Sequence, residues 1–122
     1  MISYSTLGTS DMERSITFYD AVFGALGATR ESTTAEWTQY GRSGDQAKVC
    51  LTVPYDKNRA SGGNGAMLAF KADSYDAVDK FHSFALDLGG TDEGAPGIRD
   101  GTHYVAYIRD PDGNKLCAFT PK

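Results

Sequence analysis

The sequence predicts an α+β fold of two βαβββ modules, whose curled mixed sheets form a cleft and carry the helices on their outer faces. Two helical patterns each follow one short strand-like run and precede three more. A segment rich in Gly, Ser and Asn separates them. The 122 residues suit a single domain. We therefore expect one domain over 1–122, with module 1 at about 1–55, a linker at 56–64 and module 2 at about 65–122.

The first module opens with a strand-like run over 2–7 and continues into a helix over 11–23. Ser10, followed three residues later by Glu13, has the spacing of a capping box, and apolar residues then recur at helical intervals. Three short strands are expected next, at 28–31, 36–40 and 48–53.

The second module repeats this order. A strand over 66–70 precedes a helix that begins after Ser74 and stops at Gly89-Gly90. A weak strand near Thr91 and strands over 103–109 and 115–120 follow. The last two are joined by Asp-Pro-Asp-Gly-Asn at 110–114, which favours a tight turn, and residues 96–101 are expected to form a loop next to His103.

Composition limits the possible partners. Sixteen acidic residues outnumber twelve basic ones, and the net charge of -4 argues against nucleic acid, which is bound through clustered Lys and Arg. No apolar run approaches the roughly 20 residues that span a bilayer, and the first residues do not resemble a signal peptide. We expect a cytoplasmic protein that does not bind membranes. The two cysteines lack the C-x-x-C spacing of zinc or redox motifs.

Strand parity predicts one uncovered face in each module, because neighbouring residues of a strand point to opposite sides. In the run over 48–53, the apolar Val49, Leu51 and Val53 would face a helix. The residues predicted for the uncovered face are Tyr4, Thr6, Cys50, Thr52, Met67, Cys117 and Phe119. Such a surface, with aromatic and sulfur-bearing side chains, is typical of a pocket or an interface.

The sequence resembles the vicinal oxygen chelate superfamily, which includes glyoxalase I, bleomycin-resistance proteins and extradiol dioxygenases. Three stretches carry the resemblance over essentially the whole chain: residues 7–19, with Ser-Asp-x-x-Arg-Ser-x-x-Phe-Tyr; residues 63–70; and residues 109–115, with Asp-Pro-Asp-Gly-Asn. The resemblance implies two βαβββ modules around a cleft, usually completed in a homodimer.

The resemblance also implies where a metal site would lie. Metal-using members commonly hold a divalent ion with two histidines and two carboxylates, and the corresponding positions here are Tyr4, Cys50, Met67 and Cys117. Because hard divalent ions prefer oxygen and imidazole ligands, we expect no metal ligands of the usual kind and no cofactor.

Three interpretations of the cleft remain open. The first is a protein that binds a small organic molecule, as in bleomycin-resistance proteins. The residues expected to contact that ligand are Tyr4, Thr6, Trp37, Tyr40, Cys50, Thr52, Met67, Arg99, Tyr104, Cys117 and Phe119, with Tyr107 as a further aromatic candidate.

The second interpretation is a lyase or isomerase of the lactoylglutathione lyase type, acting on a small oxygenated substrate. His103 is then the leading acid/base, because its unperturbed pKa lies near neutrality, with Cys117, Cys50 or Tyr4 assisting. The third takes Cys50, Met67 and Cys117 as a soft ligand set for an ion such as Cu(I).

Overall fold

The computed structural model describes residues 1–122, and its strands form two open, mixed, four-stranded sheets. Sheet A has the strand order β1-β4-β3-β2, and sheet B has the order β5-β8-β7-β6. The elements are β1 (Tyr4–Gly8), α1 (Met12–Gly24), β2 (Thr29–Thr33), β3 (Trp37–Gly41), β4 (Lys48–Thr52), β5 (Leu68–Lys71), α2 (Tyr75–Asp87), β6 (Thr91–Arg99), β7 (His103–Arg109) and β8 (Lys115–Pro121). This order confirms the α+β fold of two βαβββ modules.

Helix α1 forms where the apolar residues recur at helical spacing, and it buries Phe18, Tyr19, Val22 and Phe23. Its N-cap is Asp11, whose carboxylate accepts a hydrogen bond from the backbone N–H of Arg14 in the first turn. The prediction that Ser10 caps this helix is wrong. The Ser10 hydroxyl instead accepts a hydrogen bond from the backbone of Ala60, which holds the linker against module 1.

Helix α2 begins where the sequence predicts. The Ser74 hydroxyl accepts a hydrogen bond from the backbone N–H of Ala77 at 3.1 Å, which satisfies one of the free donors of the first turn. The buried residues Val78, Phe81 and Ala85 lie on one face of the helix and join the core.

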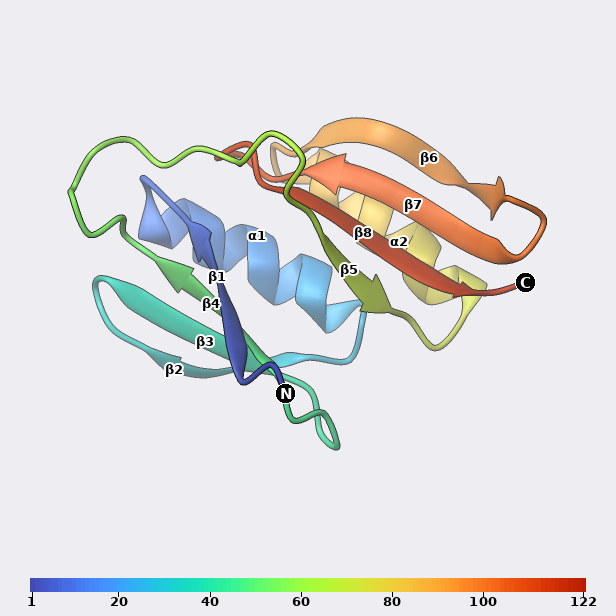
Figure 1. Ribbon diagram of the computed structural model, residues 1–122, viewed down its shortest axis with the longest axis horizontal. Helices are drawn as coiled ribbons and strands as arrows, with labels where there is room; N and C mark the ends of the chain where they lie inside the picture. The colour runs from blue at the N-terminus through green and yellow to red at the C-terminus, as the bar shows by residue number, and fades with distance from the viewer.

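A single hydrophobic core unites the two modules. Sixteen buried residues form one cluster that draws on both helices and both sheets. At its centre the ring of Phe23 in α1 meets Tyr40 of sheet A and Phe70 of sheet B, each at 5.2 Å between centroids. In Figure 1 both helices lie behind the strands, so each sheet has one helix-covered face and one uncovered face, called here the open face.

Strand β6 differs from the prediction. A weak strand was expected near Thr91 and a loop over 96–101, yet the strand runs for nine residues to Arg99. The chain turns at residues 100–102, of which Asp100 and Gly101 have positive φ. Its pairing with β7 is interrupted by two register shifts. Because β6 is the outer strand of sheet B, these irregularities accommodate Pro96 without a break in the sheet.

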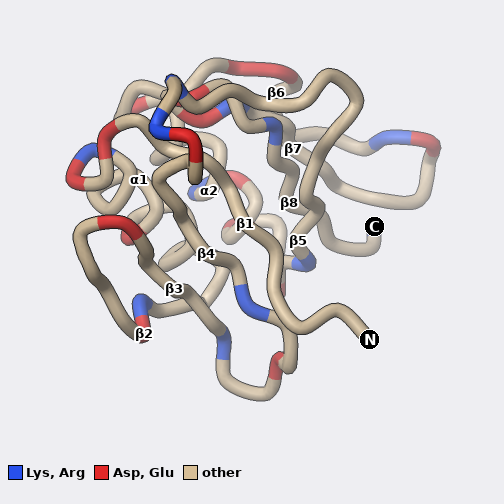
Figure 2. Tube along the Cα trace, turned by 60° about the vertical axis from the view of Figure 1, so that its left-hand side comes forward, with Lys and Arg blue, Asp and Glu red and all other residues tan.

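Neither helix is long and apolar enough to cross a membrane. Charged residues of both signs are distributed over both modules (Figure 2).

Candidate functional site

Strand register places the predicted residues of module 1 on one face of sheet A. Thr6 of β1 pairs with Cys50 of β4, and Cys50 pairs in turn with Gln39 of β3, so their side chains point to the same side. The alternate residues Leu7 and Leu51 are buried against the helix. The parity expected for this sheet is therefore confirmed.

Two aromatic side chains stand on the open face of sheet A. The rings of Tyr4 and Trp37 meet edge to face, with centroids 5.7 Å apart. Tyr4 is 55% exposed, and Trp37 is half-buried. Aromatic pairs of this kind combine a large apolar surface with a polar edge, which suits contact with a small organic molecule.

A polar cluster that the sequence interpretation missed lies on the same face. Glu31 of β2 accepts hydrogen bonds from Gln39 and from Lys48, both at 2.8 Å. These hydrogen bonds lower the pKa of the Glu31 carboxyl. The ion pair passes directly over Gly41, where an added Cβ would lie 2.5 Å from both charged groups. A side chain at this position would collide with the ion pair, and glycine leaves the space that the pair needs.

The thiols of Cys50 and Cys117 lie below the surface of the open faces. Cys50 is fully buried and Cys117 is 4% exposed, and neither forms a disulfide. The Cys50 thiol lies 4.0 Å from the amide oxygen of Gln39. Burial raises the pKa of both thiols, which disfavours the reactive thiolate.

The open face of sheet B carries the predicted residues of module 2. Cys117 is opposite Tyr107, and Phe119 is opposite Val105, so these four share a face. His103 packs edge to face against Phe119 with centroids 5.6 Å apart, and its ring nitrogen Nδ1 lies 2.9 Å from the Thr102 hydroxyl. His103 is therefore accessible from this face.

Arg99 lies flat against its own strand. Its guanidinium donates a hydrogen bond to the carbonyl of Ala95 at 2.7 Å and covers Gly94 and Gly97, where added Cβ atoms would lie 3.4 and 2.8 Å from its nitrogens. The side chain belongs to a strand rather than to the expected loop, and it remains half-buried next to Tyr107.

Two of the expected contact residues lie on the helix-covered faces instead. Tyr40 is 2% exposed, and its hydroxyl donates to Asp20 at 2.7 Å. Tyr104 stacks on Tyr75 of α2 at 4.0 Å and donates to Asp79. Both tyrosines therefore point away from the open faces on which Cys50 and Cys117 lie.

The side chains at the four positions to which the resemblance assigns metal ligands do not fit a hard divalent ion. They offer a phenol from Tyr4, a thioether from Met67 and two protonated thiols, without carboxylate or imidazole. No group of three or more His, Cys, Asp or Glu side chains is arranged to hold a metal ion. None of the three principal cavities is lined by Tyr4, Cys50, Met67 or Cys117.

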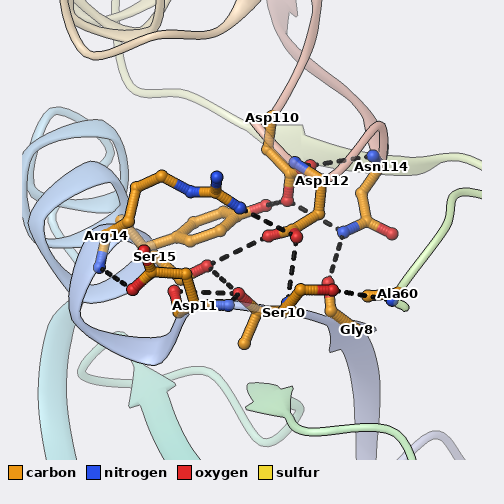
Figure 3. A network of polar contacts seen from close by, with 11 residues as sticks. Gly8, Ser10, Asp11, Arg14, Ser15, Ala60, Asp110, Asp112 and Asn114 are labelled. Atoms are coloured by element: carbon orange, nitrogen blue, oxygen red, sulfur yellow. Dashed lines mark hydrogen bonds and ion pairs between the residues drawn. The ribbon is translucent and has the colours of Figure 1, made fainter. Parts of the chain in front are cut away.

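The Asp-Pro-Asp-Gly-Asn turn has a structural role at the boundary between the modules (Figure 3). Asp110 is 4% exposed and accepts hydrogen bonds from the Tyr19 hydroxyl, from the backbone of Asp112 and from the backbone and amide of Asn114. Burial raises the pKa of Asp110, and the Tyr19 and Asn114 hydrogen bonds oppose that rise. The motif thereby anchors the centre of α1.

Asp112 binds the start of the same helix. Its carboxylate accepts from the backbone of Ser10 at 3.0 Å, from the Arg14 guanidinium at 2.9 Å and from the Ser15 hydroxyl at 3.3 Å. Only 3% of the Asp112 side chain is exposed, so these charge-assisted bonds are shielded from water.

The linker completes this network. The contacts among the Asp-Pro-Asp-Gly-Asn turn, the first half of α1 and the linker are called here the turn junction. The Ser10 hydroxyl accepts from the backbone of Ala60 at 2.8 Å, and Ala60 packs on Gly8. Gly62 lies so close to the carbonyl of Gly113 that an added Cβ would stand 2.2 Å from it. The residues that identify the motif in sequence therefore hold the modules together and do not line the open faces.

Comparison with known proteins identifies the protein family. The family model described as the glyoxalase/bleomycin resistance protein/dioxygenase superfamily matches residues 2–118. A crystal structure of a glyoxalase/bleomycin resistance protein from Albidiferax ferrireducens is 39% identical, covers 98% of both chains and superposes with a TM-score of 0.90. A probable lactoylglutathione lyase from Synechocystis is 28% identical over 93% of this chain and 89% of its own. The lactoylglutathione lyase structure from Agrobacterium tumefaciens, 20% identical over 98% of this chain and 92% of its own, shares the fold with a TM-score of 0.69.

Proposed function

The chain belongs to the glyoxalase/bleomycin resistance protein/dioxygenase superfamily, and we propose that it binds a small organic molecule on its open sheet faces without the family's usual divalent ion. One observation carries this proposal. On the open face of sheet A, the Tyr4–Trp37 pair lies on the same surface as the Glu31–Lys48 ion pair.

The side chains on this face define the class of ligand. The two aromatic rings offer an apolar contact, and the ion pair together with Gln39 offers both hydrogen-bond donors and acceptors. Such a surface suits a molecule with an aromatic or apolar part and a polar group of its own. The donor set at the metal-ligand positions supports binding through side chains alone.

The single tryptophan provides the test. Native mass spectrometry of the purified chain would identify a co-purifying molecule, and its return to stripped protein would be followed by the fluorescence of Trp37. We expect Tyr4→Ala to weaken binding about tenfold, because it removes the exposed ring of the aromatic pair. The matched control is Tyr55→Ala, just before the linker, where the ring is fully exposed. Equal affinities of the two variants would contradict the proposal.

A second candidate is a lyase that interconverts S-lactoylglutathione with glutathione and a 2-oxoaldehyde. Curated relatives that are 26–29% identical carry the name lactoylglutathione lyase, and this similarity favours the candidate. The exposed His103 is the acid/base group for that reaction, whereas the raised pKa of Cys117 makes it a poor nucleophile.

The lyase candidate has its own assay. Purified protein would be incubated with glutathione and methylglyoxal while formation of the thioester S-lactoylglutathione is followed by its absorbance, and His103→Gln should abolish any turnover. The control His82→Gln alters a histidine bonded to Asp92, outside the open faces, and should retain it. Turnover that survives His103→Gln would exclude this histidine as the acid/base group.

A further inference from the structure

The open face of sheet B carries positive charge that no carboxylate neutralises. Lys115 of β8 is in register with Arg109 of β7, on the same face as Cys117. Lys71 of β5 is in register with Phe119, farther along that face. Arg109 pairs with a glutamate of β6, but neither lysine forms an ion pair within the chain. This local excess is opposite in sign to the net charge of -4 of the whole chain.

The charges on the corresponding face of sheet A cancel. Lys48 of β4 is in register with Tyr4, and its ammonium group pairs with Glu31 at 2.8 Å. The two open faces therefore differ in charge, and an acidic molecule is attracted to the open face of sheet B.

Two cations lie next to the ring of Tyr107 in β7. The ammonium group of Lys115 lies over the ring, 5.6 Å from its centroid. The guanidinium of Arg99 is also close, because a Cβ added at Gly94 would stand 3.4 Å from one of its nitrogens and 3.0 Å from the ring. Arg99 comes from β6 and Lys115 from β8, which are the two neighbours of β7 in the sheet. Tyr107 is therefore flanked by a cation on each side.

The hydroxyl of Tyr107 has no carboxylate partner in the chain. The hydroxyls of Tyr19, Tyr40 and Tyr104, in contrast, each donate a hydrogen bond to an aspartate. Arg99 forms no ion pair, and its one hydrogen bond, to a backbone carbonyl of β6, occupies only part of its fork of N–H donors. Tyr107 and its two flanking cations thus keep donors for an incoming carboxylate.

We propose that Arg99, Tyr107 and Lys115 bind the carboxylate of a small aromatic acid on the open face of sheet B. This inference rests on the proposed function, because it assigns the chemical class of a ligand that binds to the open faces. Phe119 and Val105 lie on the same face and offer apolar contact to the body of the acid. Hydrogen bonds from a cationic group to a carboxylate are about twice as strong as those between neutral groups, so the site selects an acid over its neutral amide.

Two probes of similar shape separate the effect of charge from that of shape. The anion 2-naphthoate and the neutral 2-naphthamide would be titrated into the intact chain while backbone and methyl resonances are recorded by NMR. We expect 2-naphthoate to bind about tenfold more tightly, with shifts at Val105, Tyr107 and Cys117. Added sodium chloride should reduce this advantage, because salt screens the attraction between exposed charges.

Two variants assign the selectivity to this site. Lys115→Gln and Tyr107→Phe should each weaken 2-naphthoate about threefold and leave 2-naphthamide unchanged. The matched control is Lys71→Gln, which removes the same charge from the same face beside Phe119 and should leave both affinities unchanged. Urea denaturation would show that all three variants remain folded.

Three results would overturn the inference. An equal loss of 2-naphthoate affinity in Lys71→Gln and Lys115→Gln would show a diffuse attraction to the whole face. Equal affinities of the two probes, with shifts on the open faces, would exclude an anion site and leave the proposed function standing. Failure of both probes to bind would also exclude the site, whereas the proposed function is tested separately by Tyr4→Ala on sheet A.

Discussion

Replacement of Tyr19 by phenylalanine removes one hydroxyl from the turn junction and little else. Tyr19 is fully buried, and its hydroxyl donates to a carboxylate oxygen of Asp110, which is itself 4% exposed. Loss of a buried hydrogen bond to a charged acceptor costs about 2 kcal/mol. The free energy of unfolding of Tyr19→Phe at about pH 7 should fall by that amount, measured by urea denaturation with Trp37 fluorescence.

The pH dependence of this loss identifies its cause. Burial raises the pKa of Asp110 in the folded protein, so the group favours folding when protonated and loses that contribution as the pH rises through the folded pKa. The Tyr19 hydrogen bond stabilises the ionised form and offsets part of the loss. The destabilisation by Tyr19→Phe should therefore shrink towards about pH 4, where more of the carboxyl is protonated.

A matched variant separates this effect from loss of a tyrosine hydroxyl in general. The Tyr104 hydroxyl also donates to an aspartate, Asp79, but at an exposed position on α2. Tyr104→Phe should cost less than about 0.5 kcal/mol. Equal losses in the two variants, or a loss in Tyr19→Phe that does not change with pH, would refute the assignment of Asp110 as a buried carboxylate held by Tyr19.

The close approach of Gly62 to the carbonyl of Gly113 predicts that Gly62→Ala destabilises the chain by about 2 kcal/mol in urea denaturation. Gly24→Ala, where an added Cβ meets nothing within 4 Å, should instead stabilise it by about 0.5 kcal/mol, and similar effects of the two variants would contradict the close packing of the linker. The buried thiols of Cys50 and Cys117, with pKa values raised by burial, should react with Ellman's reagent at least about tenfold more slowly in native than in unfolded protein. Rapid reaction of either thiol in native protein would show that it reaches the surface.

Periodic patterns predicted most of the fold, because helices and strands repeat their contacts over several residues. The apolar spacing of α1, the cap at Ser74 and the alternation that places Thr6 and Cys50 on one face all follow from local geometry. Strand β6 was largely missed, because Pro96 and nearby glycines are typical of loops and are tolerated here only at an irregular sheet edge.

Features of the site that depend on contacts between distant segments were not predicted. Glu31 and Lys48 form an ion pair over Gly41, and the sequence around these three residues does not indicate that they lie together. The capping pattern at Ser10 was misassigned for a related reason. Its hydroxyl binds the backbone of Ala60, fifty residues later in the chain.

The turn junction also determines when the protein can finish folding during synthesis. The backbone N–H of Ser10 donates to the carboxylate of Asp112, which lies 102 residues later in the chain. The carbonyl of Gly8 accepts from the side-chain amide of Asn114, 106 residues later. Because a ribosome adds residues from the N-terminus at about 5 to 20 per second, these contacts wait until Asp112 and Asn114 have been made. The first module therefore lacks this polar anchor until the turn between β7 and β8 has been made.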